Sequence, residues 1–288
     1  MALSPANPPL AVEDPGVIAI HAGPPKPIFD YREYFEFRAF FRLLVWREID
    51  LRYRHTIVGI GWAVLQPAIT VIIFTLVMPL LRGNSKPVDG IPYPVFAYSG
   101  IAPWMYFVHA LTTANQSLGS YRTLLGAIYF PRIFLPASAT VAALADFSVV
   151  ALSLLVVMAG YGVWPSRMIF LAPAFILLAI AFTLGMGLWM SVVQVEYKDL
   201  FFITQFLLQL GLVAMPISYS ATSLHEPWRT WSGLNPMVTA ITGFRWAVLG
   251  VDPPGAAPIA ISVVVTLALL ASGFVFFRRK EGYVCDVA

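Results

Sequence analysis

The residues Leu43–Arg54 read LLVWREIDLRYR, and Thr56–Leu81 read TIVGIGWAVLQPAITVIIFTLVMPLL. The first stretch is basic and aromatic, and the second contains no formally charged residue. At 1.5 Å per residue the second stretch forms a helix of roughly 35–40 Å, enough to cross a bilayer core of about 30 Å with some tilt. Arginines before a first span mark the cytoplasmic side, and four lie here: Arg42, Arg47, Arg52 and Arg54. We therefore expect the chain to start inside the cell and to lay an amphipathic segment on the membrane before it crosses.

The composition supports a membrane protein. Hydrophobic residues make up 59% of the 288 residues and charged residues 11%, with a mean hydropathy of +0.76. A soluble globular chain carries about 25% charged residues. A pI of 9.0 and a net charge of +3 could suggest a nucleic-acid partner. Because the basic residues are spread over loops and termini, we expect membrane lipids and no nucleic acid as partners.

Charge-poor stretches predict an all-α polytopic membrane protein with six transmembrane helices. The six stretches are Gly59–Leu81, Tyr93–Ala114, Pro136–Gly160, Met168–Val192, Phe202–Tyr219 and Pro258–Phe277. They define a transmembrane domain over residues 56–279, followed by a cytoplasmic tail at 280–288. The Pro-rich residues 1–30 are predicted to be a disordered extension.

The distribution of Lys and Arg predicts the sidedness. If both termini are cytoplasmic, the inner segments carry 13 of the 18 basic residues and the outer segments carry 5. This excess has the direction that the positive-inside rule requires. The last span also ends in Arg278-Arg279-Lys280, which is typical of an inner stop.

The long outer segment 220–257 contains short apolar runs. The run between Arg229 and Arg245 holds about 15 residues and includes Asn235 and Pro236, which is too short for a span. Its length favours re-entrant or interfacial helices, and its tryptophans are typical of the headgroup level. The alternative is a plain outer loop.

The pattern of residues 31–55 predicts an amphipathic interface helix. Apolar residues recur at roughly helical spacing: Phe37, Phe40, Phe41, Leu44 and Leu51. The arginines of this segment that we assign to the interface are Arg38, Arg42, Arg47, Arg52 and Arg54.

One carboxylate and one imidazole lie inside predicted spans. Asp146 is the only acid deep in a span, and a carboxylate there costs roughly 2.5–3.5 kcal/mol on insertion scales. It must be paired, protonated or exposed to water, and we favour a structural contact between helices over a proton relay. His109 has no second His or acid at helical spacing, so we expect a packing residue and no metal site.

Several motifs in this order resemble one family of transporters. They are WREIDLRYR and TIVGIGWAVLQP, then YFPRIFLP in an inner loop, and LNPM and FRWAVLG in the outer segment. In combination they resemble the permease subunits of type-2 ABC exporters for O-antigen, capsule and teichoic acid chains. The resemblance runs from about Tyr31 to Arg279.

The resemblance implies an assembly in the bacterial inner membrane, with both chain termini in the cytoplasm. A homodimer of six-helix subunits would form a polysaccharide channel at its interface, and a cytoplasmic ABC ATPase dimer would drive it. The implied substrate is a long glycan on undecaprenyl diphosphate. The implied alternatives for the interface helix are contact with the ATPase or lipid diphosphate, or a simple membrane anchor.

The sequence lacks a phosphate-binding loop. Such a loop needs Gly-Lys-Ser/Thr, and the four lysines follow Pro25, Ser85, Tyr197 and Arg279. We therefore expect this subunit not to be an enzyme and to hold no cofactor, with ATP and Mg²⁺ bound by the partner ATPase.

The inner loop Asn115–Pro136 is the expected docking element for that ATPase. A helical stretch of about Gln116–Ile128 precedes Pro131, which would end it. By resemblance this coupling region, 115–135, presents Arg122, Tyr129, Phe130 and Arg132. The alternative is a surface helix that carries positive-inside charge.

Two mixed stripes could line a glycan pathway. The first span carries Trp62, Gln66, Thr70 and Phe74, and the fifth carries Phe202, Gln205 and Gln209. Amides bind sugar hydroxyls and aromatic rings contact their C–H faces, whereas the alternative is ordinary hydrogen bonding between helices. Two other functions stay open: a type-2 exporter of a drug or lipid, and a membrane-embedded glycan or lipid enzyme.

Overall fold

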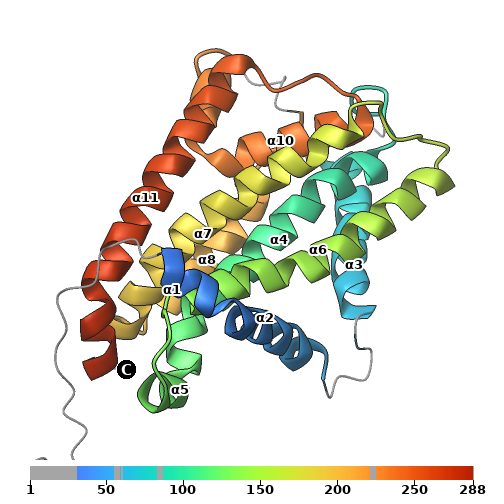
Figure 1. The fold of residues 1–288 in the computed structure, drawn as a ribbon. Coiled ribbons are helices and arrows are strands. Elements are labelled where there is room, and N and C mark those ends of the chain that lie inside the picture. The colour runs from blue at the N-terminus through green and yellow to red at the C-terminus, as the bar shows by residue number, and fades with distance from the viewer. Residues whose placement is uncertain (1–30, 55–58, 60, 83–86, 221–224, 288) are drawn as a thin grey trace, which may run out of the picture.

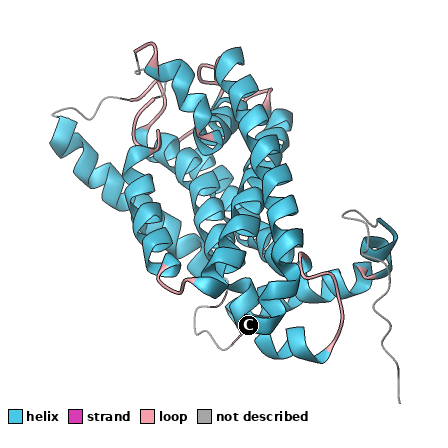
Figure 2. Cartoon of the chain, turned by 90° about the vertical axis from the view of Figure 1, so that its left-hand side faces the viewer, coloured by secondary structure: helices cyan, strands magenta, loops and turns pink. Residues whose placement is uncertain are grey.

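The computed structural model describes residues 31–54, 59, 61–82, 87–220 and 225–287, and this part of the chain is helical (Figure 2). Within these residues, the only strand-like feature is an isolated β-bridge between Val88 and Ile91. The helices are, in chain order, α1 (Tyr31–Glu36), α2 (Arg38–Tyr53), α3 (Gly61–Arg82), α4 (Tyr93–Ser120), α5 (Arg122–Ala127), α6 (Phe134–Gly160), η1 (Ile169–Leu171), α7 (Ala172–Glu196), α8 (Leu200–Ala214), α9 (Trp228–Trp231), η3 (Ser232–Leu234), α10 (Pro236–Leu249) and α11 (Ala256–Val287). The predicted extension 1–30 lies outside the described residues.

Each of the six predicted spans overlaps a helix, namely α3, α4, α6, α7, α8 and α11. Within the described ranges, three helical segments are both long and apolar enough to cross a membrane: Phe134–Gly160, Ile169–Glu196 and Ala256–Gly282. Gly61–Val77 and Leu200–Ala214 are apolar but shorter. The chain is therefore a helical membrane protein with three candidate spans of full length.

The prediction for the fifth span was wrong at its C-terminal end. Helix α8 ends at Ala214 instead of continuing to Tyr219, and Met215 has an extended backbone with ψ of 152°. Met215 precedes Pro216, whose ring disfavours helical backbone in the residue before it. At 1.5 Å per residue α8 is only about 22 Å long, less than the bilayer core of about 30 Å.

Helix α4 forms the centre of the molecule. It packs against α3, α6, α7, α8 and α10, as Figure 1 shows. Its buried residues include aromatic ones such as Phe96, Tyr98 and Trp104 and small ones such as Ala110 and Ala114. The small residues let neighbouring backbones approach closely, as in other membrane bundles.

A second apolar cluster lies at the end of the bundle where α2 and α5 meet α6, α7 and α11. We call it the inner cluster, and its buried members include Leu44, Leu118, Phe130, Phe134 and Phe277. Phe37, Phe40 and Phe41 of the predicted interface helix pack against it. The interface segment therefore packs along α6 as well as presenting a free surface.

The boundaries of three predicted segments differ from the structure. The expected inner-loop helix 116–128 is divided at Tyr121, between the end of α4 and the start of α5. The interface segment is divided at Phe37, between α1 and α2. The predicted tail 280–288 begins inside α11, which continues to Val287.

Candidate functional site

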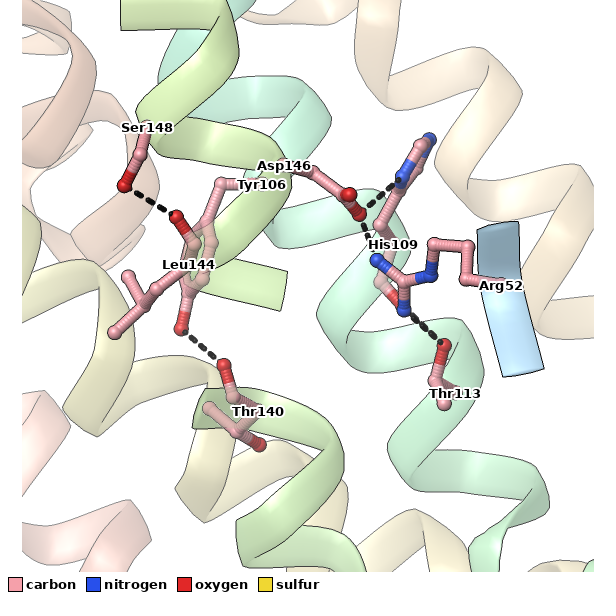
Figure 3. Close-up of polar contacts among 8 residues, drawn as sticks. All are labelled: Arg52, Tyr106, His109, Thr113, Thr140, Leu144, Asp146 and Ser148. Atoms are coloured by element: carbon pink, nitrogen blue, oxygen red, sulfur yellow. Dashed lines mark hydrogen bonds and ion pairs between the residues drawn. The ribbon is translucent and has the colours of Figure 1, made fainter. Parts of the chain in front are cut away.

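Three charged or titratable side chains from three helices meet near the middle of α6. Asp146 projects from α6, His109 from α4 and Arg52 from the C-terminal end of α2, and Figure 3 shows both basic side chains pointing at the carboxylate. Arg52 Nη1 forms an ion pair with Asp146 Oδ2, and His109 Nδ1 lies 3.6 Å from the same oxygen. Arg52 Nη2 also donates a hydrogen bond of 3.4 Å to Thr113 Oγ1 of α4. We call Arg52, His109 and Asp146 the charge cluster.

Burial makes this pairing necessary. Asp146 is 5% exposed, and an unpaired buried carboxylate costs far more than a paired one. Burial also lowers the pKa of the Arg52 guanidinium from its ordinary value, while Glu48 acts in the opposite direction. Since an arginine stays protonated in proteins, the cluster contains at least one full ion pair.

The sequence predicted a contact between helices for Asp146 but not its partner. The partner comes from the interface helix rather than from another span, and His109 finds its acid on a different helix. One pattern could have indicated this: Leu44, Glu48 and Arg52 follow each other at four-residue spacing and so share a face of α2. Leu44 is 2% exposed, which places that face toward the protein.

The Asp146 side chain also borders a small cavity. Asp146 Oδ1 has no hydrogen-bond partner among the described residues. The cavity of about 10 Å³ beside this side chain is lined by Gln66 of α3 and by Tyr106 and His109 of α4, among others. Four helices, α2, α3, α4 and α6, therefore converge on this acid.

The first predicted pathway stripe lies on α3 with mixed surroundings. Trp62 is 50% exposed and Gln66 is exposed, whereas Thr70 and Phe74 are half-buried. The Thr70 hydroxyl donates a 2.9 Å hydrogen bond to the backbone carbonyl of Gln66. Gln66 therefore belongs both to the exposed stripe and to the wall of the Asp146 cavity.

The second predicted stripe lies on α8. Phe202 and Gln209 are exposed, and Gln205 Nε2 donates a 3.0 Å hydrogen bond to Thr112 Oγ1 of α4. Helix α3 packs against α4 and α6, whereas α8 packs against α4 and α7. One subunit therefore does not bring the two stripes together.

The four predicted coupling residues point in two directions. Arg122 and Tyr129 are exposed, the latter by 60%. Phe130 is buried in the inner cluster, and its ring centroid lies 4.9 Å from that of Phe40. The backbone N–H of Arg132 donates a 3.2 Å hydrogen bond to Glu281 Oε1, and its guanidinium donates to the Glu281 carbonyl. Phe130 and Arg132 therefore hold the loop to α2 and α11.

The interface helix presents a basic and apolar outer surface. Four of the five arginines assigned to the interface are exposed: Arg38, Arg42, Arg47 and Arg54. Leu43, Trp46 and Leu51 are 60%, 69% and 58% exposed, so Leu51 does not join the buried face as predicted. In the last turn of α2, Arg52 points inward instead, where it pairs with Asp146.

The start of the inner loop is fixed to α2 by Tyr121. Its hydroxyl donates a 2.6 Å hydrogen bond to Glu48 Oε1, and the Arg47 guanidinium lies 4.8 Å from its ring centroid. Burial raises the pKa of the Tyr121 hydroxyl above its ordinary value, and the bond to Glu48 adds to this. The hydroxyl therefore remains a donor at neutral pH.

The three outer residues singled out from the sequence shape α10. Asn235 caps the helix by accepting a 3.1 Å hydrogen bond from the Met237 N–H, and Pro236 occupies the first helical position. Arg245 is 2% exposed within α10. All three positions therefore serve the local structure of the outer segment.

Arg245 is held by neutral groups. It donates to the carbonyls of Pro216 at 2.8 Å and Ile217 at 3.0 Å, and to Ser99 Oγ at 3.2 Å. Its guanidinium carbon lies 3.8 Å from the centroid of the Phe96 ring. This arginine therefore joins α10, α4 and the chain that follows α8.

The family follows from comparison with known proteins. Residues 39–249 match the model of the family described as "ABC-2 type transporter". The chain belongs to this ABC-2 type transporter family. The match begins in α2 and ends in α10, so it covers the charge cluster, the inner loop and both predicted stripes.

Two relatives with a described function are similar to this chain over most of their length. The "O-antigen export system permease protein RfbA" of Myxococcus xanthus is 29% identical over 256 residues, which are 88% of this chain and 96% of that protein. A protein of the same description from Klebsiella pneumoniae is 22% identical over 200 residues, 69% of this chain and 76% of that protein.

Proposed function

We propose that this ABC-2 family member is the permease subunit of an ATP-driven exporter that moves a lipid-linked polysaccharide of the O-antigen class across the bacterial inner membrane. The observation that carries the proposal is the similarity to the Myxococcus xanthus permease, which extends over nearly the whole of both chains. The carrier lipid that we propose is undecaprenyl diphosphate.

The proposed membrane arrangement has six spans, with both termini in the cytoplasm. It is supported by six helices at the predicted positions and by the 13-to-5 distribution of basic residues. Helices α3, α4 and α8 supply the three spans beyond those that are long and apolar enough by themselves. The outer helices α9 and α10 would then lie at the outer membrane–water boundary.

The proposed energy source is a separate ABC ATPase dimer, because the sequence contains no Gly-Lys-Ser/Thr loop. The exposed side chains Arg122 and Tyr129 are the proposed docking contacts. ATP and Mg²⁺ would bind to that partner and not to this chain.

The proposed glycan pathway requires two copies of the chain. The α3 and α8 stripes lie apart within one subunit, so they can share a pathway only across a subunit interface. A homodimer supplies two of each stripe, and amide and aromatic side chains suit a polymer that must slide without tight binding. The residues assigned to this pathway are Trp62, Gln66, Thr70, Phe74, Phe202, Gln205 and Gln209.

A deletion strain tests this function. Cells without the permease should accumulate a lipid-linked glycan inside and lose it from the surface, and the wild-type gene should reverse both effects. Trp62→Ala and Gln66→Leu should each lower the surface glycan at normal permease levels, because they remove a sliding surface and a hydrogen-bonding amide.

Ile72→Ala is the matched control on α3. Its side chain is 56% exposed but lies on a different face from Gln66, so surface glycan should stay normal. Unchanged surface glycan in the deletion strain would contradict the proposed cargo and favour export of a drug or lipid. Normal export by both stripe variants would contradict the pathway assignment alone.

A further inference from the structure

Helix α2 is fastened to α6 and its neighbours at both of its ends, in addition to the hydrogen bond between Glu48 and Tyr121 near its middle. Near its start, Phe40 contacts Phe130 of the inner loop and Phe41 contacts Phe134 of α6, with ring centroids 4.9 Å and 5.1 Å apart. At its end, Arg52 is paired with Asp146. The 16-residue helix α2 thus connects the inner loop with the middle of α6.

The two fastening points differ in what they tolerate. Aromatic contacts such as Phe40–Phe130 can slide by a few tenths of an ångström at little cost, because dispersion attraction is weak for each pair of atoms. A buried ion pair cannot separate cheaply, since each partner would be left as an unpaired charge. Arg52 and Asp146 are therefore expected to move together.

The ion pair also reaches more than one helix. Arg52 donates to Thr113 of α4, and His109 of α4 contacts the same carboxylate oxygen. Gln66 of α3 lines the small cavity that Asp146 and His109 also line. A displacement of Arg52 would consequently act on α4 and α6 directly and on α3 through that cavity wall.

We infer that the Arg52–Asp146 ion pair is a positioning contact that carries displacement of the interface helix to α4 and α6 during export. The inference rests on the proposed function, because the displacement originates where the ATPase is proposed to dock. The inner loop passes it to α2 through the hydrogen bond of Tyr121 to Glu48 and through the packing of Phe130, and the ion pair passes it from the end of α2 to the middle of the bundle. The pair stays closed throughout.

A reversible cross-link tests whether the pair transmits movement. Arg52→Cys and Asp146→Cys are combined in a Cys285→Ser background, which removes both charges together and leaves no unpaired buried charge. The permease with its co-purified ATPase is reconstituted in liposomes with the glycan lipid extracted from the deletion strain. ATP hydrolysed per glycan transported is measured before and after a short bifunctional thiosulfonate, and again after reduction.

Without the cross-link, ATP hydrolysed per glycan should rise by roughly two- to thirty-fold, the range by which coupling residues act elsewhere. With the cross-link this ratio should return to within about two-fold of the wild-type value. Reduction of the cross-link should raise the ratio again. A contact that serves only for stability would lower the yield of assembled complex without changing this ratio.

Asp50→Asn is the matched control. It removes a carboxylate of the same helix, which forms an exposed ion pair of 3.3 Å with Arg54, and the ratio should not change. An unchanged ratio in the reduced double variant would overturn the inference. So would a cross-linked form that hydrolyses ATP without export, since the contact would then have to open. A wild-type complex that moves no glycan would instead contradict the proposed function.

Discussion

The two deeply buried charged side chains among the described residues are stabilised in different ways. Asp146 has the opposite charge of Arg52 as its partner, whereas Arg245 has the carbonyls of Pro216 and Ile217 and the face of an aromatic ring. Carbonyl dipoles and a π face are attractive to a cation, and they do not titrate. Arg245 therefore depends on close and exact placement of neutral groups, and space around it is limited.

Gly100 of α4 supplies part of that space. A Cβ at this position would overlap Arg245 Nη2 and lie 3.2 Å from the Ile217 Cα. We expect Gly100→Ala to lower the free energy of unfolding by about 1–3 kcal/mol, as overpacking does. The thermal unfolding of purified protein in detergent measures this.

Gly119→Ala on the same helix is its control. A Cβ there would have no atom within 4 Å, so the better helix propensity of alanine should raise stability by up to about 1 kcal/mol. Equal effects of the two substitutions would contradict the tight packing around Arg245.

At the scale of elements, the inner loop and α2 form one unit that has two faces. Phe130 and Phe40 face inward, while Tyr129 is exposed beside its buried neighbour. Adjacent residues of this loop therefore have different roles: Phe130 stabilises the permease, and Tyr129 is proposed to contact a partner.

Tyr129→Ala and Phe130→Ala should have opposite consequences. Tyr129→Ala, alone or with Arg122→Ala, should weaken co-purification of the ATPase while the permease unfolds at its normal temperature. Phe130→Ala should destabilise the permease by about 3–5 kcal/mol, because it truncates an aromatic side chain that is 2% exposed. Undiminished co-purification of the ATPase with the Tyr129 and Arg122 variants would remove the case for docking at this loop.

The six apolar helices could be predicted from the sequence because each of them carries its own apolar run. The end of α8 could not be located so well, since the proline effect at Met215 competes with a continuing apolar pattern. The charge cluster depends on Arg52 and Asp146, which lie on helices far apart in the chain. Periodicity places each on its own helix face, but only the packing of α2 along α6 brings them together.

At the scale of the whole molecule, five helices pack directly on α4, and the proposed sidedness orients this bundle in the membrane. The end of the bundle with the inner cluster also carries the inner loop and the last turns of α11 (Figure 1). In the proposed orientation this is the cytoplasmic end, where an ATPase would meet the permease.

Cys285, the sole cysteine of the chain, reports this orientation directly. A membrane-impermeant maleimide should leave it unlabelled in intact spheroplasts and label it after lysis, because the positive-inside rule places the C-terminus in the cytoplasm. The Cys285→Ser protein controls for other targets. Labelling before lysis would require the opposite topology.

The pairing of Arg52 with Asp146 also bears on how the protein is made. Because the ribosome synthesises the chain from its N-terminus, Arg52 has emerged before Asp146 does. The carboxylate of α6 can therefore meet its counter-ion as the translocon releases the helix, instead of entering lipid alone. Synthesis in this order thus brings the cation of the pair out of the ribosome before the acid.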